Sequence, residues 1–353
     1  MTLRSFSCTD FRCLASVQLE FDERFNLVYG ANASGKTSLL EAIAYLGRGK
    51  SFRGAPTERL VRHGASEFLL RGSVRSGVRD TSIGVRNGRS GLEISIGGDR
   101  SGGVAALASA LPLQVMDPDV HSLVAGGPEH RRRYLDWLTF HVEHGYLDLW
   151  RRFRRALKQR NAALREGLTR ELSSWDAEFV QLALSVDASR RRALDKALPV
   201  LETVGLRLLG SEVGFEYIQG WVSGRTLAEA LAAGVDRDLA AGSSSAGPHR
   251  ADLRLIYDDR QARKLVSRGQ QKLLASAMIL AASRVVQLRL EHPLLLLLDD
   301  PAAELDQRSL ERLMEEVTDL GAQVIATALT LDPGWFPAPP ATFHVEQGVL
   351  SLG

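Results

Sequence analysis

The sequence has few cysteines and no long apolar run. Its 353 residues include only two cysteines, Cys8 and Cys13, which argues against structural disulfides and four-cysteine zinc sites. The longest unbroken aliphatic run, Leu294 to Leu298, is far shorter than the ~20 residues that span a bilayer. The N-terminal residues carry charges and lack the apolar block of a secretory signal. These absences predict a cytoplasmic protein with no membrane association.

What is present is the composition of an ordinary globular protein with a basic middle. Hydrophobic residues make up 44% of the chain and charged residues 24%, and the length allows two domains. The net charge is +2, but residues 130–200 hold 15 Lys and Arg against 9 Asp and Glu. This excess of arginine indicates either a surface for nucleic acid or another polyanion, or a solvated helix face whose arginines pair with nearby acids. Charge alone leaves both interpretations open.

Hydrophobic periodicity predicts that residues 1–115 form strands and turns with one clear helix. We expect a strand at 25–29, a helix at 37–46 and antiparallel hairpins over 66–96. This segment is predicted to be the N-terminal part of a lobe that the C-terminal residues complete.

The pattern turns helical over 116–242, which we predict to be an inserted arm lobe. An apolar and aromatic stripe from Leu172 to Val186 has helical spacing but covers too few heptads for a long coiled coil. Residues 240–247, which are rich in Ala, Ser and Gly, are predicted to form a flexible loop or domain junction.

Residues 243–353 are predicted to complete the lobe that residues 1–115 begin. The expected elements are a strand at 252–257, a helix at 270–290, a strand at 294–298, a helix at 309–320 and a strand at 323–327. This alternation is typical of an α/β fold with a parallel sheet.

The strongest motif follows the strand at 25–29. Eight consecutive residues match G-x-x-x-x-G-K-[ST]: Gly30, Ala31, Asn32, Ala33, Ser34, Gly35, Lys36 and Thr37. Glycines let the backbone curl so that successive N–H groups face a phosphate, and the helix N-terminus adds a favourable dipole. The motif predicts that Lys36 binds the β- and γ-phosphates of ATP and that Thr37 ligates Mg²⁺.

Two carboxylates, Asp299 and Asp300, follow the apolar run. Five apolar residues fit a strand buried on both faces, and α/β sheets bind ligands at the carboxyl ends of such strands. We expect Asp299 to hold Mg²⁺, largely through water, and Asp300 to orient or deprotonate the attacking water. An acidic helix cap after a buried strand is the plain alternative.

A third element, Ser267-Arg268-Gly269-Gln270, precedes a long helix. Ser267 and Gly269 at a helix start make a second candidate anion site, although Ser267 and Gln270 also suit a simple helix cap. The order of P-loop, Ser-x-Gly-Gln, acidic pair and a following Leu-Asp resembles ATP-binding-cassette ATPases, in which the Ser-x-Gly-Gln helix of one protomer completes the site of another.

Further motifs make the chain similar to the RecF family, short-armed relatives of the structural-maintenance-of-chromosomes ATPases. They are Phe11-Arg12, Leu40-Glu41-Ala42-Ile43, Pro118-Asp119, Gly126-Gly127-Pro128, Arg131-Arg132-Arg133-Tyr134-Leu135-Asp136, Gly247-Pro248-His249-Arg250-Ala251-Asp252-Leu253 and Ser267-Arg268-Gly269-Gln270. The motifs around Arg131 and His249 have no general ATPase explanation, so they discriminate best.

The resemblance implies an ABC-type P-loop ATPase lobe with an inserted helical arm, ATP-dependent homodimerisation and weak DNA-stimulated ATP hydrolysis. It also implies binding to single-stranded and double-stranded DNA at gaps or junctions. Partnership with RecO and RecR in loading RecA is implied in the same way.

The chain departs from these patterns at several positions. Ala33 stands where the family often has Gly, Asp300 replaces the Glu of transporter cassettes, and Thr327 stands nearest to the place of a switch histidine. Gln114 is a candidate sensor of Mg²⁺, and Arg12 a candidate phosphate contact.

Two other functions share parts of this pattern. The nucleotide-binding subunit of a transporter has the same chemistry but is expected to carry Gly at position 268 and a switch histidine. A structural DNA-bridging protein would bind ATP without useful turnover. For His249 the sequence leaves two roles open, a structural role and a role at the lobe interface.

Overall fold

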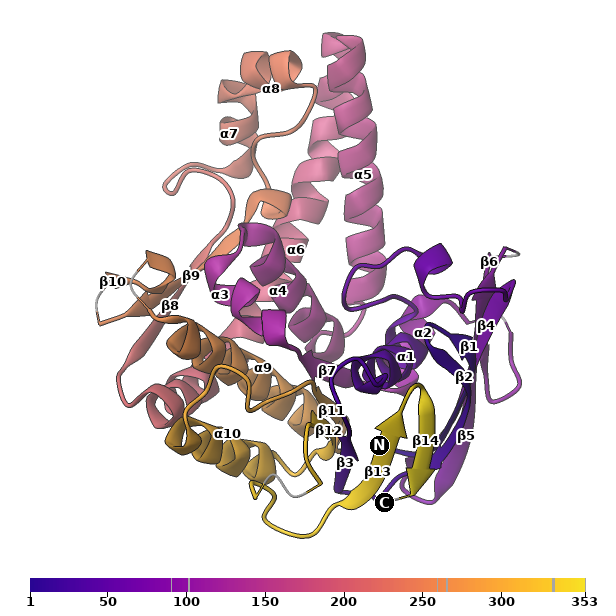
Figure 1. Cartoon of the computed structure of the whole chain (residues 1–353). Helices are drawn as coiled ribbons and strands as arrows, with labels where there is room; N and C mark the ends of the chain where they lie inside the picture. Colours follow the sequence, from indigo (N-terminus) through magenta and orange to yellow (C-terminus); the bar gives the residue numbers. More distant parts are fainter. Residues whose placement is uncertain (90, 101, 259, 265, 332–333, 353) are drawn as a thin grey trace. The chain divides into compact units, whose positions relative to one another are not determined.

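The computed structural model of the chain (Figure 1) describes residues 1–89, 91–100, 102–258, 260–264, 266–331 and 334–352. The described residues form two compact units, unit 1 (residues 1–120 and 290–353) and unit 2 (residues 121–289). Unit 1 thus runs five residues past the predicted boundary at 115, and residues 243–289 pack with unit 2. That residues 243–353 act together as one part of an ATPase lobe is a statement about function and stays a prediction.

Unit 1 contains an antiparallel sheet of five strands in the order β2-β1-β4-β5-β6. The strands are β1 (Thr2–Phe11), β2 (Leu14–Glu20), β4 (Glu67–Ser76), β5 (Arg79–Gly88) and β6 (Gly91–Ile96). Buried and exposed residues alternate along them, so one face belongs to the core and the other faces solvent. The hairpins predicted over 66–96 are confirmed.

The second sheet of unit 1 has the order β14-β13-β3-β12-β11-β7 and is parallel except for its β13–β14 hairpin. Its strands are β3 (Phe25–Tyr29), β7 (Leu113–Met116), β11 (Leu295–Leu298), β12 (Gln323–Ala328), β13 (Ala341–Glu346) and β14 (Val349–Leu352). All side chains of β11 are buried, as expected for a central parallel strand. Parallel pairing brings the carboxyl ends of β3, β12, β11 and β7 to one edge.

Helix α1 (Lys36–Arg48) lies in the core shared by the two sheets. Leu39, Leu40, Ile43 and Leu46 are fully buried and belong to one cluster with residues of β1 and β11. Because α1 follows β3 directly, its N-terminus stands at the edge where the parallel strands end. The remaining helices of unit 1 are the 3-10 turn η1 (Thr57–Arg59), α2 (Val104–Ala110) and α10 (Gln307–Leu320), and η2 (Pro118–His121) lies at its boundary.

Unit 2 is mainly helical. Its elements are α3 (Ser122–Ala125), α4 (Pro128–Val142), α5 (Tyr146–Glu166), α6 (Thr169–Leu209), α7 (Leu227–Ala233), α8 (Val235–Ala241), α9 (Arg268–Leu290), the 3-10 turns η3 (Pro248–Arg250) and η4 (Ala262–Lys264), and the strands β8 (Val213–Ile218), β9 (Asp252–Tyr257) and β10 (Arg260–Gln261). Helices α5 and α6 form a hairpin whose contact buries Phe153 against Phe179, with ring centroids 5.6 Å apart. The predicted stripe from Leu172 to Val186 lies in this contact.

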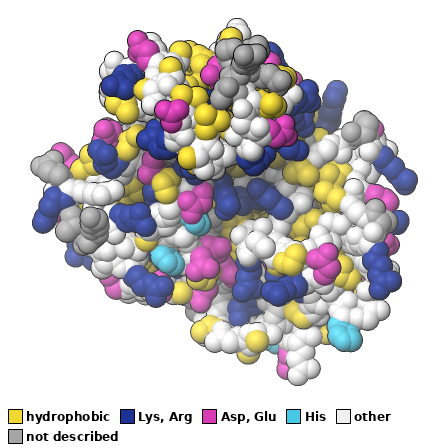
Figure 2. Space-filling model, turned by 90° about the horizontal axis from the view of Figure 1, so that it is seen from above, with side chains coloured by type: hydrophobic (Ala, Val, Ile, Leu, Met, Phe, Trp, Pro, Cys, Tyr) yellow, Lys and Arg dark blue, Asp and Glu magenta, His cyan; other side chains and the backbone are white. Residues whose placement is uncertain are grey.

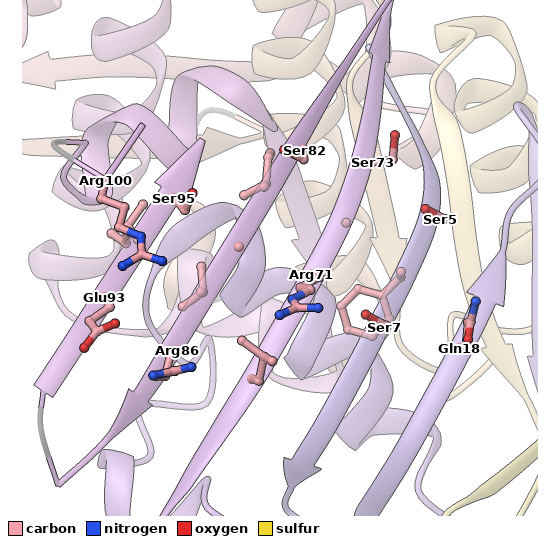
Figure 3. A pocket seen from close by; sticks show the side chains of 17 residues that line it. Ser5, Ser7, Gln18, Arg71, Ser73, Ser82, Arg86, Glu93, Ser95 and Arg100 are labelled. Carbon is pink, nitrogen blue, oxygen red and sulfur yellow. The ribbon is translucent and has the colours of Figure 1, made fainter. Parts of the chain in front are cut away.

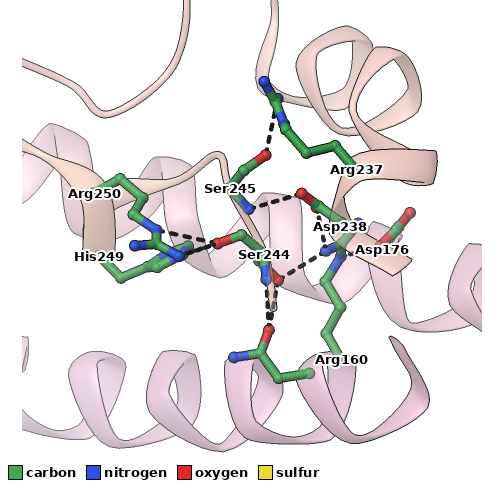
Figure 4. Close-up of polar contacts among 9 residues, drawn as sticks. Arg160, Asp176, Arg237, Asp238, Ser244, Ser245, His249 and Arg250 are labelled. Atoms are coloured by element: carbon green, nitrogen blue, oxygen red, sulfur yellow. Dashed lines mark hydrogen bonds and ion pairs between the residues drawn. The ribbon is translucent and has the colours of Figure 1, made fainter. Parts of the chain in front are cut away.

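Two expectations for this region are wrong. The strand at 252–257 is not in the parallel sheet, because β9 pairs with β8 and β10 in a separate antiparallel sheet of three strands. Residues 240–247 are not a loose junction either. Ser244 is fully buried, its hydroxyl donates to Asn161 (2.7 Å) and accepts from Arg160 (2.8 Å), and the segment is held inside unit 2 (Figure 4). A polar composition therefore marked a buried hydrogen-bonded loop.

Among the described residues, one helix is long and apolar enough to cross a membrane. It is α9, and 72% of its most apolar window is buried inside the protein. Helices in the core of globular proteins have the same composition, so this is weak evidence for a membrane span.

Candidate active site

The P-loop residues form a tight turn between β3 and α1. Gly30 and Gly35 have φ of 152° and 119°, and Ala33 also adopts a left-handed φ of 63°. A side chain on Gly30 would meet the carbonyl of Val345 at 2.3 Å, so this position has no room for a Cβ atom. Local strain of this kind gathers at sites that bind ligands.

The cradle fits a phosphate chain, as judged from its own polar atoms. The Lys36 ammonium donates to the carbonyls of Gly30 (2.7 Å) and Ala31 (2.8 Å), so it lies folded back over the turn. The hydroxyl of Ser34 is buried without a hydrogen-bond partner among the described residues. Both groups are available to phosphate oxygens placed over the turn, while Asn32 and Ala33 are exposed.

The acidic strand end meets the start of α1. The Thr37 hydroxyl donates to Asp299 Oδ1 at 3.1 Å, and the Thr327 hydroxyl donates to the same oxygen at 2.9 Å. The backbone N–H of Asp300 in turn donates to the Thr327 hydroxyl at 2.9 Å. Thr327 is fully buried on β12, so it locks the ends of β12 and β11 together. Asp300 itself has a left-handed φ of 49°.

The charges at this edge influence one another. Burial raises the pKa of Asp299, while hydrogen bonds from Thr327 and Thr37 oppose the rise. Partial burial lowers the pKa of Lys36, and the carboxylates of Asp300 and Asp299 counteract this. The structure therefore brings Lys36, Thr37, Asp299 and Asp300 together at this edge. This group has the oxygen ligands that Mg²⁺ prefers.

Gln114 does not join this group. Its side-chain oxygen accepts a hydrogen bond from Arg48 (3.1 Å) in the last turn of α1. Thr37 lies eleven residues before Arg48 on α1, which separates the two residues by roughly 16 Å along the helix axis at 1.5 Å per residue. The register of β7 and β11 pairs Gln114 with Leu296, two residues before the strand end. The choice of Gln114 relied on residue type, whereas position along the strand decides which side chain reaches the edge.

Asp117, rather than Gln114, lies at the end of β7 beside the acidic strand end. It follows β7 directly, beside Asp299, whose backbone N–H donates to the carbonyl of Met116 at 2.8 Å. Burial and the neighbouring carboxylates of Asp119 and Asp299 raise its pKa to about 6. Sequence reasoning missed Asp117, although its position after an apolar strand was a usable signal.

Two arginines near the P-loop differ in their surroundings. Arg12 forms a two-pronged ion pair with Glu41, which is fully buried on α1, so its guanidinium is already occupied within the protein. Arg53 is exposed, and its charge weakly opposes the rise that burial causes in the pKa of Asp299. The candidate phosphate contact Arg12 is thus a structural ion pair in this state, and Arg53 is a cation that the sequence analysis did not single out.

The start of α9 in unit 2 has the geometry of a capping box. The Ser267 hydroxyl accepts from the backbone N–H of Gln270 (3.3 Å), and the Gln270 side chain accepts from the backbone N–H of Ser267 (2.9 Å). Within one chain the cap alternative therefore holds. Ser267 remains exposed, and Gly269 is half-buried.

The motifs around Arg131 and His249 meet inside unit 2. Arg131, 4% exposed, pairs with both carboxylate oxygens of Asp252, and Arg132 donates to the carbonyl of Ala251 at 2.8 Å. Arg190 in α6 bonds to Asp136 (2.7 Å) and to the carbonyl of Pro248 (2.6 Å). The two most discriminating motifs are thus a single buried network.

His249 lies in the same interior. Its Nε2 donates to the carbonyl of Ser244 at 2.9 Å (Figure 4). Its ring packs near Phe153 and Phe179. Burial, together with nearby arginines, lowers its pKa to about 4, so the ring is neutral at pH 7. Of the two roles considered for His249, these contacts within unit 2 favour the structural one.

Comparison with known proteins defines the class first. The profile of the RecF/RecN/SMC N-terminal domain matches residues 2–333. A Smc head domain from Pyrococcus furiosus has the same fold, with a TM-score of 0.61, 15% identity and coverage of 100% of this chain and 96% of that one. The predicted fold, an α/β ATPase lobe of ABC type combined with a helical insertion, is confirmed.

The particular family follows from closer relatives. The chain is 36% identical over 358 residues to the DNA replication and repair protein RecF of Shewanella pealeana, covering 100% of this chain and 99% of that one. A Shewanella baltica protein of the same description is 37% identical over 360 residues, with the same coverage. The structure of the recombination mediator protein RecF with ATP, from the RecFOR pathway, superposes with a TM-score of 0.89 at 24% identity, over 100% of this chain and 97% of that one. The chain belongs to the RecF family.

Proposed function

We propose that this protein is an ATP-controlled DNA-binding recombination mediator of replication and repair, acting in the cytoplasm. The observation that carries the proposal is the contact of Thr37 with Asp299 beside Lys36, at the carboxyl edge of the parallel sheet. This is the arrangement that P-loop ATPases use to hold a nucleotide with its metal ion.

The chemistry of the site follows from its own groups. Lys36 exchanges its two backbone carbonyls for phosphate oxygens, and the backbone N–H groups of the turn bind the same chain of phosphates. Thr37 and Asp299 would hold Mg²⁺, which would supply positive charge beside the phosphates. Asp300 orients the attacking water and takes its proton. Asp has a lower intrinsic pKa than Glu, so we expect slow hydrolysis.

A complete site needs a second copy of the chain. Ser267, Gly269 and Gln270 lie at the start of α9, whose N–H groups carry the positive end of the helix dipole. Ser267 is exposed, and its hydroxyl has only a local capping partner. We propose that this helix start binds the γ-phosphate held by a partner protomer, so that ATP drives formation of a two-fold dimer with two shared sites.

DNA binding is assigned to the exposed side of α5. Arg151, Arg152, Arg154, Arg155 and Lys158 are exposed on this helix. Acidic side chains are interspersed with basic ones over the face drawn in Figure 2, and the net charge of the chain is only +2. The local surplus of basic side chains on α5 is therefore more informative than the net charge. Phosphate contacts by such side chains position DNA without reading its sequence, which suits gaps and junctions in duplex and single-stranded DNA.

The partners RecO and RecR, and the loading of RecA, are proposed from family membership alone. Of the two rival functions, the transporter subunit expects Gly at position 268 and a switch histidine, where this chain has Arg268 and Thr327. The DNA-bridging protein without turnover is separated by measuring ATP hydrolysis with and without gapped duplex DNA.

The central test is Lys36→Ala. We expect loss of ATP-dependent dimerisation and of ATP-dependent DNA binding, with the circular dichroism spectrum and unfolding midpoint retained. A matched control is Arg79→Ala, which removes one exposed charge from the same unit. Unchanged ATP affinity in Lys36→Ala would contradict the proposal.

The shared site is tested by mixing two inactive proteins. Lys36→Ala and Ser267→Arg each spoil both sites of their own homodimer. A mixed dimer contains one doubly defective site and one site that joins an intact P-loop with an intact Ser267. Mixing should therefore restore part of the DNA-stimulated ATPase, at protein concentrations where dimer formation is verified independently. Mixed dimers that form and stay inactive at every ratio would count against shared sites.

A further inference from the structure

The outer face of the five-stranded sheet in unit 1 holds none of the residues assigned to the ATPase chemistry. Its inner face packs on α1, whereas the outer face is open and hollowed (Figure 3), with a volume of about 630 Å³. A sheet face left to solvent usually carries mixed polar side chains. On this face, most of the polar side chains are serine or arginine.

Serine and arginine dominate the polar side chains that line the hollow, beside apolar residues such as Leu69. Five serines, two arginines, one glutamine and one glutamate point from its strands, Arg100 follows β6, and the charged groups sum to +2. Arg71 and Arg100 form no ion pair with any residue that the structure describes, and both are exposed. Arg86 lies 3.6 Å from Glu67, but both side chains are nearly half exposed, so this pair is weak. The face therefore offers three available guanidinium groups.

One row of residues crosses the whole sheet. Ser7 pairs with Gln18 on one side and with Arg71 on the other, Arg71 pairs with Gly84, and Gly84 pairs with Ser95. Five strands at a spacing of ~4.8 Å make this row about 19 Å wide. Short side chains on either side of Arg71 leave its guanidinium prominent over a shallow floor.

Gly84 has no internal reason to be glycine. It has an ordinary strand φ outside the left-handed region, and a Cβ atom there would meet nothing closer than the Cβ of Ser95 at 3.8 Å. In contrast, a Cβ on Gly72, on the inner face, would lie 2.7 Å from Leu46. Glycine weakens a strand interior and often marks the close approach of another molecule. Only the outer face is left to explain Gly84.

We propose that this outer face binds the sugar-phosphate backbone of duplex DNA. The inference rests on the proposed function for the presence of DNA and adds a second contact surface to α5. Arginine, serine and glutamine are side chains that contact phosphate oxygens, and a bare glycine lets the backbone approach. No exposed aromatic ring lines the hollow, whereas single-strand binding relies on stacking. Protein interfaces are depleted in serine and enriched in aromatics, so they fit this face poorly.

The first experiment measures duplex binding by the full chain with ATP and Mg²⁺ over a range of salt. The variant Arg71→Ala/Arg86→Ala/Arg100→Ala should bind at least about tenfold more weakly at 0.1 M salt, and the slope of log K against log salt should fall by about 3. Arg79→Ala, on the same sheet but outside the hollow, is the matched control and should change the slope little.

The second experiment separates binding from folding. Gly84→Thr places a β-branched residue on a strand, where it should keep or raise the free energy of unfolding. The same change fills the floor and should weaken duplex binding about tenfold. In a Cys13→Ser background, the introduced thiol of Ser73→Cys should react freely with a maleimide and be protected when duplex DNA is added.

The outcomes distinguish this inference from the proposed function. If the unaltered protein binds no duplex with ATP, the proposed function fails. If it binds duplex, and neutralising α5 weakens binding while the triple variant and Gly84→Thr do not, the sheet-face inference is overturned. Loss of binding to poly-L-glutamate by the triple variant, with duplex binding unchanged, would assign the face to an acidic protein instead.

Discussion

The arginines of unit 2 fall into two sets with different physical roles. Arg131, Arg160 and Arg190 are 4% exposed or less, and each pairs with at least one aspartate. The arginines of α5 from Arg151 to Arg155 point to solvent. The sequence shows both sets as similar basic clusters. The comparison teaches that an excess of arginine measures internal ion pairing as well as external charge.

The largest effect is expected from breaking a buried pair. Arg160 donates to Asp176 (2.7 Å) and to Asp238 (3.1 Å) with no exposed surface of its own (Figure 4). Arg160→Leu leaves these carboxylates without their cation and should lower the free energy of unfolding by about 3–5 kcal/mol. Urea unfolding measures the change.

The matched control for this prediction is Arg155→Leu on the same helix. Its side chain is exposed, so the change should stay within about 0.5 kcal/mol. Similar losses for the two variants would contradict the division into buried and exposed sets.

The next prediction uses pH to probe the charges around the buried set. His249 faces Arg250, Arg132 and Arg160, and its pKa of about 4 lies below the unfolded value of about 6.5. The unfolded chain therefore binds more protons between these values, so stability falls as pH is lowered from 6.5 toward 4, by up to about 3 kcal/mol. Unfolding at several pH values should show this slope.

The control for the pH prediction is His249→Gln, which should lose that part of the slope. Asp117 has the opposite influence in unit 1, because its pKa is raised to about 6 and the folded state binds the extra proton. Both the unaltered protein and the His249→Gln variant keep Asp117, so the difference between their slopes of stability against pH measures the contribution of His249. Equal slopes would mean that the ring does not titrate as its surroundings indicate.

The sequence predicted the features that a local pattern specifies, and it did not predict those that depend on contacts between residues far apart in the chain. The P-loop, the strand before Asp299 and the helix at 37–46 were predicted because local pattern specifies each of them. The misplaced strand at 252–257 and the choice of Gln114 depended on which strands pair and in which register. Register is set by contacts between residues far apart in the sequence, such as Leu298 with Met116, and no local pattern encodes them.

The buried arginines were hidden for a related reason. Arg131 and Asp252 are 121 residues apart, yet they form a two-pronged ion pair. In the sequence, Arg131 and the exposed Arg133 belong to the same run of three arginines, and no local pattern distinguishes the buried one from the exposed one. A motif with no ATPase explanation was therefore a better sign of a buried network than the charge count was.

Arg131 and Arg133 also allow a comparison of a buried and an exposed arginine, with an expected loss of unfolding free energy that is intermediate in size. Besides Asp252, Arg131 reaches the carbonyls of Leu123, Val124 and Gly126 at 3.1–3.3 Å. Arg131→Lys keeps the charge but loses the planar fork, and it should cost about 2 kcal/mol of unfolding free energy. Arg133→Lys is the control and should be neutral. A neutral Arg131→Lys would show that charge alone, without the bidentate geometry, holds the network.

The smallest effect on stability is expected on α5, where the effect on DNA should be clear. Arg151, Arg155 and Lys158 are spaced by four and three residues and share one exposed side. Arg151→Ala/Arg155→Ala/Lys158→Ala should leave the unfolding midpoint unchanged, because these side chains make few contacts within the protein. The slope of log K for DNA against log salt should fall by about 3 if each contacts a phosphate.

Arg192 and Lys196 provide the contrast, since both are exposed but already pair with Glu143 at 2.8 and 3.0 Å. Their replacement by alanine should change the salt slope by less than one. An unchanged slope for the α5 variant would reduce its arginines to a solvated surface and leave the sheet face as the remaining candidate for DNA.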